Sequence, residues 1–228
     1  MKTIALIVAG GSGTRFGGEV PKQFLLLKGT PVLMRTIQAF EQALAGSDHE
    51  IVVTLPLSQQ DHWQQLCRDH GMAVAHRVVA GGDTRWGSVK NALDAIGSPE
   101  GIDVIAVHDG VRPLASPALI DRVLTAARQH GSAIPVVALN DSVRQVDSEG
   151  NSHALDRSTL RAVQTPQAFD ARWLMEAYQQ PYQTRFTDDA SVIESMGRTV
   201  TLVEGDPANL KITRPADLAL ASILLPDA

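Results

Sequence analysis

The feature that most constrains this chain is its opening, where an aliphatic segment runs directly into a cluster of glycines. Residues 3–9 are almost all apolar, three glycines follow within residues 10–13, and Arg15 and Lys22 come soon after. Glycine lets backbone N–H groups approach a polyphosphate closely because it has no Cβ, and Arg and Lys offer fixed positive charge to phosphoryl oxygens. The opening therefore predicts a buried strand that ends in a nucleoside-triphosphate site.

The glycine cluster differs from the two commonest nucleotide-binding loops. A P-loop ends in Gly-Lys-Ser or Gly-Lys-Thr, whereas residues 13–15 of this chain read Gly-Thr-Arg. A dinucleotide-binding fingerprint spaces its glycines G-x-G-x-x-G and expects an acidic residue on the next strand, but the next apolar segment, residues 51–55, ends in Pro56. A simple turn needs only one or two glycines, so the cluster with its two cations favours nucleotide binding.

Length and charge narrow the class of protein. A chain of 228 residues suggests one domain, residues 1–228. The formal net charge of −5 argues against a nucleic-acid-binding protein, since no long basic run offsets it, although local charge in a cleft can still attract an anionic substrate. The single cysteine, Cys67, excludes an intramolecular disulfide and a multi-cysteine metal site, and its helical surroundings predict a packed side chain.

No targeting or membrane segment is expected. Met1, Lys2 and Thr3 lead directly into the first strand, without the regions of a signal peptide. No apolar run approaches the roughly 20 residues of a membrane span. We therefore expect a cytoplasmic protein.

Strand and helix patterns alternate over the first two-thirds of the chain. The expected strands are rich in Val and Ile and apolar on both faces, as buried parallel strands are; they cover residues 3–9, 50–55, 73–79, 103–108 and 133–137. The expected helices between them cover residues 32–45, 58–70, 85–95 and 117–130. This alternation predicts an α/β fold with an open, mostly parallel, Rossmann-like sheet and helices on both faces.

Local signals predict where some of these helices begin. Ser58 and Asp61 have the spacing of a capping box at the second helix, Asp83 is the expected N-cap of the third, and Thr213 is the expected cap of a last helix over residues 215–225. Two further helices, residues 173–179 and 188–197, and a strand over residues 200–204 are expected between them.

The segment from residue 139 to 161 breaks the α/β pattern. It is polar, alternates over short runs and carries a turn signal at residues 149–151, which predicts a β-hairpin. A hairpin that buries little by itself usually packs on something else. We therefore expect arm 139–161 to serve in dimerisation.

Two motifs follow expected strands, where ligands of open α/β sheets bind. The first, after the third strand, contains Gly82, Asp83 and Ser88, and offers close backbone approach and polar edges to a base. The second contains Asp109, which can hold a Mg²⁺ or accept from a substrate hydroxyl, and Arg112, which can hold Asp109 or bind a phosphate. A plain Asp109–Arg112 surface salt bridge is the alternative for this second motif.

Three later motifs are less specific. Arg157 and Thr165 could bind an incoming phosphate or hydroxyl, but a polar surface is the alternative for Arg157, Arg161 and Gln167. The carboxylates of residues 188 and 189 suit a helix start, with a metal role as the weaker alternative. Lys211 follows a turn from which it could reach into the cleft.

Taken together, these segments resemble the family of 2-C-methyl-D-erythritol 4-phosphate cytidylyltransferases from Ala9 to Leu218. The resemblance rests on the ordered set Ala-Gly-Gly-x-Gly-x-Arg, Pro-Lys-Gln, Gly-Gly-x-x-Arg-x-x-Ser-Val, His-Asp-x-x-Arg-Pro, Thr-Pro-Gln, Thr-Asp-Asp and Asn-x-Lys-Ile-Thr. It implies a sheet of the nucleotide-diphospho-sugar transferase type and a homodimer in which the arm is exchanged between subunits.

The resemblance also implies a role for each candidate residue. Arg15 and Lys22 would stabilise charge on the α-phosphate, and Arg157 and Lys211 would place the substrate phosphate, with Arg157 serving the neighbour's site. CTP would lie on Ala9, Gly10, Gly11, Gly13, Gly82, Asp83 and Ser88. The polyol would lie on Asp109, Arg112 and Ser142, with Thr165 beside it, and Mg²⁺ would bridge the CTP phosphates, with Asp109 as the candidate protein ligand.

The implied reaction is transfer of CMP from CTP to 2-C-methyl-D-erythritol 4-phosphate in the non-mevalonate isoprenoid pathway, with no nucleic-acid or membrane partner. Three alternatives stay open at this point. They are a ribitol 5-phosphate cytidylyltransferase, another sugar-nucleotide pyrophosphorylase, and an inactive nucleotide-binding regulator. A substrate panel, a panel of nucleotides and a turnover assay would separate them.

Overall fold

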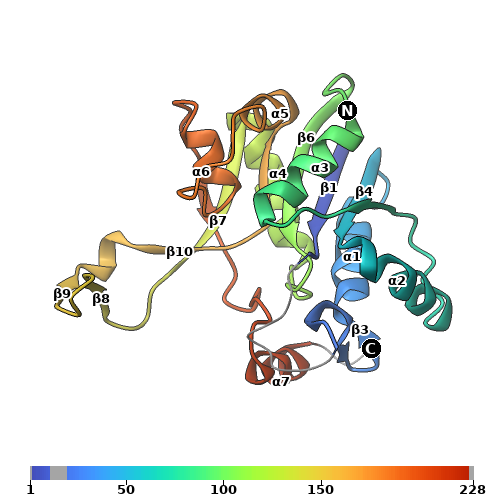
Figure 1. Ribbon diagram of the computed structural model, residues 1–228, viewed down its shortest axis with the longest axis horizontal. Coiled ribbons are helices and arrows are strands. Elements are labelled where there is room, and N and C mark those ends of the chain that lie inside the picture. The colour runs from blue at the N-terminus through green and yellow to red at the C-terminus, as the bar shows by residue number, and fades with distance from the viewer. Residues whose placement is uncertain (1, 11–19, 226–228) are drawn as a thin grey trace.

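The computed structural model describes residues 2–10 and 20–225 of the chain, and the structural findings concern those residues. A central sheet carries helices on both sides, and a two-stranded arm projects from the body (Figure 1). The strands of the sheet follow the order β10-β7-β11-β6-β1-β4-β5, and β12 also pairs with β7. This is the predicted open, mostly parallel α/β sheet.

In the described part of the chain, eight strands form the sheet, and β1 is one of its interior strands. The strands are β1 (Lys2–Val8), β4 (His49–Leu55), β5 (Arg77–Ala80), β6 (Ile102–Asp109), β7 (Ser132–Ala138), β10 (Arg161–Val163), β11 (Gln167–Asp170) and β12 (Leu202–Glu204). The two-residue strands β2 (Leu26–Leu27) and β3 (Thr30–Pro31) pair with each other outside the sheet, as do β8 (Val143–Val146) and β9 (Ser152–Leu155) in the arm.

The helices follow the expected periodicity closely. They are α1 (Val32–Leu44), α2 (Leu57–Asp69), α3 (Arg85–Ile96), α4 (Pro117–His130), α5 (Ala171–Ala177), α6 (Asp189–Glu194) and α7 (Pro215–Leu224), with short 3-10 turns η1 (Lys22–Phe24) and η2 (Arg157–Thr159). None of the helices within the described ranges is long and apolar enough to cross a membrane.

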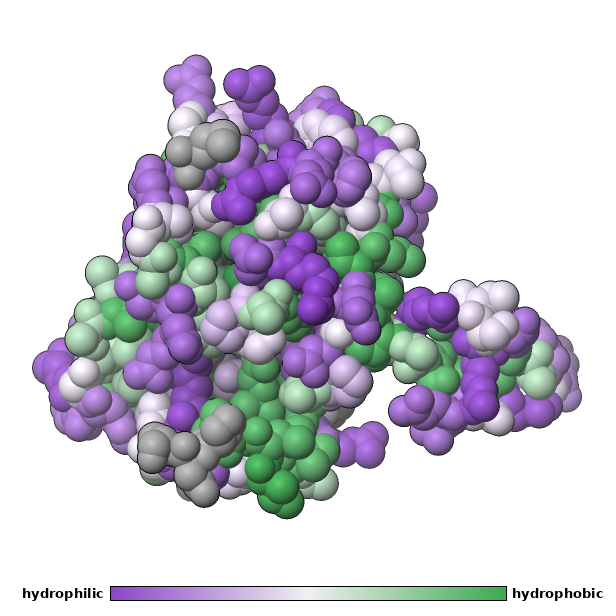
Figure 2. Space-filling model, turned by 180° about the vertical axis from the view of Figure 1, so that it is seen from behind, coloured by the Kyte–Doolittle hydropathy of each residue, from purple (hydrophilic) through white to green (hydrophobic). Residues whose placement is uncertain are grey.

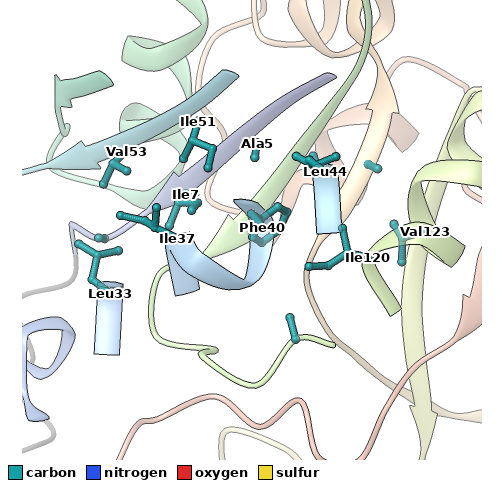
Figure 3. Close-up of a cluster of buried hydrophobic side chains, with 14 of the residues drawn as sticks. Ala5, Ile7, Leu33, Ile37, Phe40, Leu44, Ile51, Val53, Ile120 and Val123 are labelled. Carbon is teal, nitrogen blue, oxygen red and sulfur yellow. The ribbon is translucent and has the colours of Figure 1, made fainter. Parts of the chain in front are cut away.

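Strand β1 lies inside the sheet, and both of its faces are apolar. It pairs in parallel with β4 on one edge and with β6 on the other. On one face, Ile7 packs with Ile37 and Phe40 of α1, as Figure 3 shows, and on the other face Leu6 packs with Val89 of α3. Burial on both faces fixes β1 rigidly, so its carboxyl end is a firm base for the glycine-rich loop.

Three predictions about helix starts were wrong, those for Ser58 with Asp61, for Asp83 and for Thr213. Helix α2 begins after Pro56, whose fixed φ suits a helix entry, and Ser58 and Asp61 form no capping bond there. Helix α3 is capped by Thr84, whose hydroxyl oxygen accepts from the N–H of Gly87 at 2.9 Å, rather than by Asp83. Helix α7 likewise has Arg214 at its N-cap, and the Asp217 carboxylate binds the N–H groups of Thr213 and Arg214.

The predicted β-hairpin is present and stands apart from the body. The carboxylate of Asp147 accepts from the N–H groups of Glu149 and Asn151, each at 2.9 Å, and so holds the turn. Within the described ranges, β8 and β9 pair only with each other, and Figure 2 shows the arm as a lobe separated from the main surface. A two-stranded ribbon with so little support is marginally stable alone.

Candidate active site

A cavity of about 360 Å³ opens where β1, β5 and β6 end. Its lining comes from five separate stretches of the described chain. The lining residues are Val8, Ala9, Gly10, Lys22, Gln23, Gly82, Asp83, Thr84, Arg85, Ser88, Asp109, Val111 and Lys211. The structure thus brings most of the sequence-predicted nucleotide residues together at the strand ends, where open α/β sheets bind ligands.

The loop after β5 is held closed by a serine. Ser88 is buried, and its hydroxyl oxygen accepts from the N–H of Gly82 at 3.1 Å while the hydroxyl donates to the carbonyl of Thr84 at 3.0 Å. Gly82 is required here because a Cβ would lie 2.7 Å from the carbonyl carbon of Gly87. The loop is therefore preformed, with Asp83 exposed at its tip.

Lys22 is held at the cavity by the residues that follow it in η1. The Gln23 side chain is buried and donates to the carbonyl of Ala9 at 3.0 Å and to Oε1 of Gln59 at 2.8 Å. Phe24 stacks on Trp63 of α2 with ring centroids 6.0 Å apart. These contacts join η1 to the end of β1, so Lys22 lines the same cavity as Ala9 and Gly10. Apart from its place in the Pro-Lys-Gln motif, Gln23 carries no local signal of this role.

Asp109, at the end of β6, is surrounded by three cations. Lys211 Nζ lies 2.9 Å from Oδ2, Arg112 Nε lies 3.4 Å from the same oxygen, and Arg85 Nε lies 3.4 Å from Oδ1. The contact with Arg112 exists as the sequence alternative expected, but the side chains are mostly buried and the arrangement is more than a surface salt bridge. Two of the three contacts are long, which leaves acceptor capacity on the carboxylate.

This surrounding keeps Asp109 ionised. Burial opposes its negative charge, but the charges of Arg85, Lys211 and Arg112 outweigh burial and hold the pKa of Asp109 well below its ordinary value. Burial likewise opposes the charge of Arg85, and the neighbouring carboxylates outweigh it, so the Arg85 pKa is raised. Burial prevails at Arg112, whose pKa is lowered. The cavity thus contains a permanently charged carboxylate among cations.

A buried row of hydrogen bonds lies beneath Asp109. The Thr165 hydroxyl oxygen accepts from the N–H of Asp109 at 3.0 Å and lies 3.1 Å from Nδ1 of His108, whose Nε2 lies 3.1 Å from the carbonyl of Arg112. A carbonyl only accepts, so Nε2 carries the proton. Burial, the largest influence, lowers the pKa of His108 to about 4, so the ring is neutral and Nδ1 accepts from the Thr165 hydroxyl.

This row of hydrogen bonds bears on the prediction for Thr165. His108 is a core histidine with no exposed surface. Thr165 is also buried, lies outside the cavity lining, and uses its hydroxyl within the protein. Its predicted contact with the polyol stays a prediction, and the structure gives the hydroxyl a second task, which is to orient Asp109.

The segment that carries Lys211 is tied to the end of β6. The N–H of Ile212 donates to the carbonyl of Val111 at 2.9 Å. Asn209 is fully buried, its side-chain amide donates to the carbonyl of Thr165 at 2.8 Å, and its own carbonyl accepts from Arg112 at 2.7 Å. Lys211 therefore reaches the cavity as predicted, supported by Asn209, to which sequence reasoning assigned no role.

Sequence reasoning also missed the partners of Arg85. The Arg85 guanidinium binds Oδ2 of Asp189 at 2.6 Å, and the other carboxylate oxygen of Asp189 accepts from the Tyr178 hydroxyl at 2.6 Å. Asp188 is the N-cap of α6, as expected. Gln167 is buried rather than part of a polar surface, and it binds Asp188 and the N–H of Ala190. The sequence signals for this group were motif positions alone: Arg85 in Gly-Gly-x-x-Arg, Gln167 in Thr-Pro-Gln, and the two aspartates in Thr-Asp-Asp.

Some predicted site residues do not meet the cavity within one subunit. Ser142 and Arg157 are exposed in the arm, and neither lines the cavity. The Arg157 guanidinium donates to the carbonyl of Asn140 at the base of the arm. Gly11, Gly13 and Arg15 lie outside the described residues.

The residues at the cavity fit a divalent cation whose ligands come mainly from the nucleotide phosphates and only in part from the protein. Asp109 offers an ionised carboxylate with a weakly engaged Oδ1. The part of the chain that the structure describes contains no group of three or more His, Cys, Asp or Glu side chains able to hold a metal alone. Mg²⁺ commonly binds proteins through one or two carboxylates together with substrate phosphates, so the donor set suits a shared site.

Comparison with known proteins gives consistent matches over the whole chain. A family model described as IspD, 2-C-methyl-D-erythritol 4-phosphate cytidylyltransferase, matches residues 3–227. A 2-C-methyl-D-erythritol 4-phosphate cytidylyltransferase from Porphyromonas gingivalis is 49% identical over 225 residues, which cover 98% of each protein. One from Bacteroides fragilis is 48% identical over 221 residues, covering 97% of this chain and 98% of the relative.

A solved structure agrees with these sequence matches. The crystal structure of 2-C-methyl-D-erythritol 4-phosphate cytidylyltransferase from Thermus thermophilus superposes on this chain with a TM-score of 0.75 at 32% identity. The superposition covers 98% of both chains.

Proposed function

Because this chain belongs to the 2-C-methyl-D-erythritol 4-phosphate cytidylyltransferase family, we infer that the cavity at the ends of β1, β5 and β6 is where it joins its two substrates. The enzyme transfers CMP from CTP to 2-C-methyl-D-erythritol 4-phosphate in isoprenoid biosynthesis. The products are 4-diphosphocytidyl-2-C-methyl-D-erythritol and pyrophosphate. The assignment of the site rests on one observation: Lys22, Lys211 and Asp109 line the same cavity, next to the preformed loop after β5.

The chemistry explains why cations gather there. A phosphate oxygen of the sugar-alcohol phosphate attacks the α-phosphorus of CTP in line, and pyrophosphate leaves. Several negative charges must come together, so positioning and electrostatic stabilisation dominate the catalysis. Lys22, fixed by Gln23 to the end of β1, would stabilise the charge that builds on the α-phosphate, together with Arg15. No general base is needed, because the attacking phosphate is already ionised at neutral pH.

The loop after β5 would hold the base of CTP. Its backbone and the Asp83 side chain are available at the cavity, while the Ser88 hydroxyl is already satisfied by Gly82 and Thr84. Ser88 would therefore act chiefly by keeping the loop in shape. A preformed loop loses little conformational freedom on binding, which favours affinity.

Asp109 and Lys211 would act as a pair at the phosphates. Lys211 would bind the phosphate of the second substrate, and Asp109 would hold Lys211 in reach and contribute an oxygen to Mg²⁺. When bound, Mg²⁺ supplies charge neutralisation across the CTP phosphates. Arg112 binds the carbonyl of Asn209 and lies outside the cavity lining; its predicted contact with the polyol stays a prediction.

The arm supports a proposal about assembly. Ser142 and Arg157 are predicted to bind substrate, yet they lie on a hairpin outside the cavity of their own subunit. Val146 on the arm and Val163 and Leu202 near its base are exposed apolar residues. A homodimer in which each arm serves the neighbouring cavity would cover such residues and complete both sites. The cytoplasmic location expected from the sequence stays a prediction.

The family match does not support the three alternatives that the sequence left open. Pyrophosphate release tests the function directly. The assay uses CTP and Mg²⁺ and compares 2-C-methyl-D-erythritol 4-phosphate with ribitol 5-phosphate, then CTP with UTP and GTP. Turnover confined to CTP and the methylerythritol substrate is the expected result. Turnover with ribitol 5-phosphate alone would keep the nucleotide site and overturn the polyol assignment.

A further inference from the structure

A carboxylate outside the cavity holds one of the cations that line it. Asp189 is completely buried at the start of α6 and does not line the cavity. It receives the Arg85 guanidinium at 2.6 Å, and Arg85 is the first residue of α3, directly after the nucleotide loop. Arg85 lies farther from Asp109, at 3.4 Å. The guanidinium is therefore bound mainly to the carboxylate that faces away from the ligand.

Asp189 is itself held from two sides. Its second oxygen accepts from the Tyr178 hydroxyl at 2.6 Å, and the Tyr178 ring stacks on Trp86, the residue after Arg85, with centroids 5.4 Å apart. Helix α6 is fastened to β11 by Gln167, which binds both the Asp188 carboxylate and the N–H of Ala190. Asp189 has no freedom to follow Arg85, so it fixes where the guanidinium lies.

The position of Arg85 decides how much of Asp109 is available. Oδ2 of Asp109 is used by Lys211 and Arg112, whereas among residues 2–10 and 20–225 the contact of Oδ1 is the long one with Arg85. Without Asp189, Asp109 would be the carboxylate that remains in contact with this mostly buried guanidinium among the described residues, and a close ion pair between them would occupy Oδ1. Charged hydrogen bonds are most favourable near 2.7–2.9 Å, so the 3.4 Å separation is maintained by the competing bond.

We propose that Asp189 is a positioning residue for nucleotide binding: it holds Arg85 off Asp109 and thereby keeps Oδ1 of Asp109 open to the nucleotide and its divalent cation. This inference rests on the proposed role of Asp109. Asp189 touches no substrate in this scheme and acts only through Arg85. Its effect must therefore disappear when Arg85 is removed.

The test is direct binding of CTP in the presence of Mg²⁺, by isothermal titration calorimetry without the second substrate. Asp189→Asn keeps the size of the side chain and removes its charge, and it should weaken CTP binding by about 10–100-fold, as loss of such outer partners commonly does. In steady state, KM for CTP should rise more than kcat falls. Asp188→Asn is the matched control, because Asp188 caps the same helix without touching Arg85; it should lower the melting temperature and leave CTP binding unchanged.

A double-mutant cycle separates positioning from packing. In an Arg85→Gln background, Asp189→Asn should change CTP binding by less than about twofold. The double variant should also melt closer to the wild type than Arg85→Gln alone, because the single variant leaves Asp189 buried without its partner. Equal effects of Asp189→Asn in both backgrounds would overturn the proposal, as would unchanged CTP binding by Asp189→Asn alone.

A milder variant covers the case in which Asp189→Asn does not fold. Tyr178→Phe removes only the hydroxyl that orients Asp189, and it should weaken CTP binding by about threefold. Unchanged binding with a lowered melting temperature would overturn the proposal. Failure of the wild-type protein to bind CTP would instead count against the proposed site, which the wild-type titration reveals before any variant is made.

Discussion

Lys211 Nζ lies 2.9 Å from Oδ2 of Asp109, which joins the segment before α7 to the carboxyl end of β6. The charges of Lys211 and Asp109 offset each other, but Arg85 and Arg112 also contact Asp109. This cluster of four side chains therefore keeps a net positive charge. Removing Lys211 leaves Asp109 with two long contacts. The role of the lysine can therefore be tested apart from the rest of the cluster.

Lys211→Met should lower kcat/KM for 2-C-methyl-D-erythritol 4-phosphate by about 10²–10³ while the fold is retained, since the stem is kept and one cation aimed at the reacting phosphate is lost. Steady-state kinetics with circular dichroism provide the measurement. Lys90→Met is the control, because Lys90 pairs with Asp94 on the exposed side of α3. A Lys211 variant within a few-fold of the wild type would remove this lysine from the site.

Lys22→Ala should lower kcat by about 10²–10³, the usual loss when one contact to developing charge is removed. KM for CTP should change less, because the charge on the α-phosphate grows in the transition state. Single-turnover measurement of pyrophosphate formation checks this directly, with Lys90→Ala as the matched control. Near-normal kcat in Lys22→Ala would contradict the assignment of Lys22.

Substitutions at Thr165 test the row of buried hydrogen bonds that joins Asp109, Thr165 and His108. Thr165→Val keeps the shape but leaves the N–H of Asp109 unpaired in the core, which should cost about 1–3 kcal/mol of unfolding free energy and lower kcat/KM by about tenfold as Asp109 shifts. Thr165→Ser retains the hydroxyl and should stay near the wild type in both. Urea unfolding and steady-state kinetics are measured on the wild type and both variants. Equal stability and equal kcat/KM in Thr165→Val and Thr165→Ser would exclude a role of the hydroxyl in orienting Asp109.

His108 predicts how stability depends on pH. Its pKa is lowered from 6.5 to about 4, chiefly by burial, so the unfolded chain takes up a proton at a higher pH than the folded protein does. The free energy of unfolding should therefore fall as pH drops from about 6.5 toward 4, by up to about 3 kcal/mol, and be insensitive to this group above pH 7. The pKa of Asp109 is lowered from 3.8, so protonation of this group reduces the free energy of unfolding only at pH values below about 4.

Urea unfolding between pH 4 and 8, without nucleotide or metal, measures this dependence. His108→Gln should flatten the curve between pH 4 and 6.5, whereas His153→Gln, on the exposed arm, should leave it unchanged. A wild-type curve with no slope in that interval would show that the His108 ring is protonated in the folded protein.

The sheet and the cavity could be predicted from the sequence because the signals for them are local. The aliphatic run before Gly10 and the Gly82 and Asp109 motifs each mark the end of a strand, and parallel strands end at one edge of the sheet. The strands β10 and β11 were missed because they are short and antiparallel, and pairing with β7 decides their conformation.

The supporting residues could not be predicted in the same way. Asp189 has the local pattern of a helix start, and its partner Arg85 lies 104 residues earlier in the chain. Asn209 and Gln167 look like polar loop residues until the fold buries them. Nothing local distinguishes a carboxylate that caps a helix from one that receives a distant guanidinium, so these roles require the structure.

Mixed dimers test whether the arm serves the neighbouring subunit. Lys22→Ala inactivates a cavity and leaves its arm intact, whereas Arg157→Ala alters the arm and leaves the cavity intact. If arms are exchanged, a mixed dimer has one cavity with both Lys22 and the neighbour's Arg157. The purified mixed dimer should then show about half of wild-type activity, because one of its two sites is complete, and an unseparated random mixture of the two inactive variants should show about a quarter.

The experiment requires co-expression with two tags, tandem purification of the mixed dimer, and the pyrophosphate assay. Each variant mixed with tagged copies of itself is the control and should stay inactive. If each arm instead served its own cavity, every subunit of the mixed dimer would lack one of the two residues, and activity would remain at the level of the single variants. That result, or a monomer in analytical ultracentrifugation, would overturn the exchange of arms, whereas restored activity would assign Arg157 to the partner's cavity.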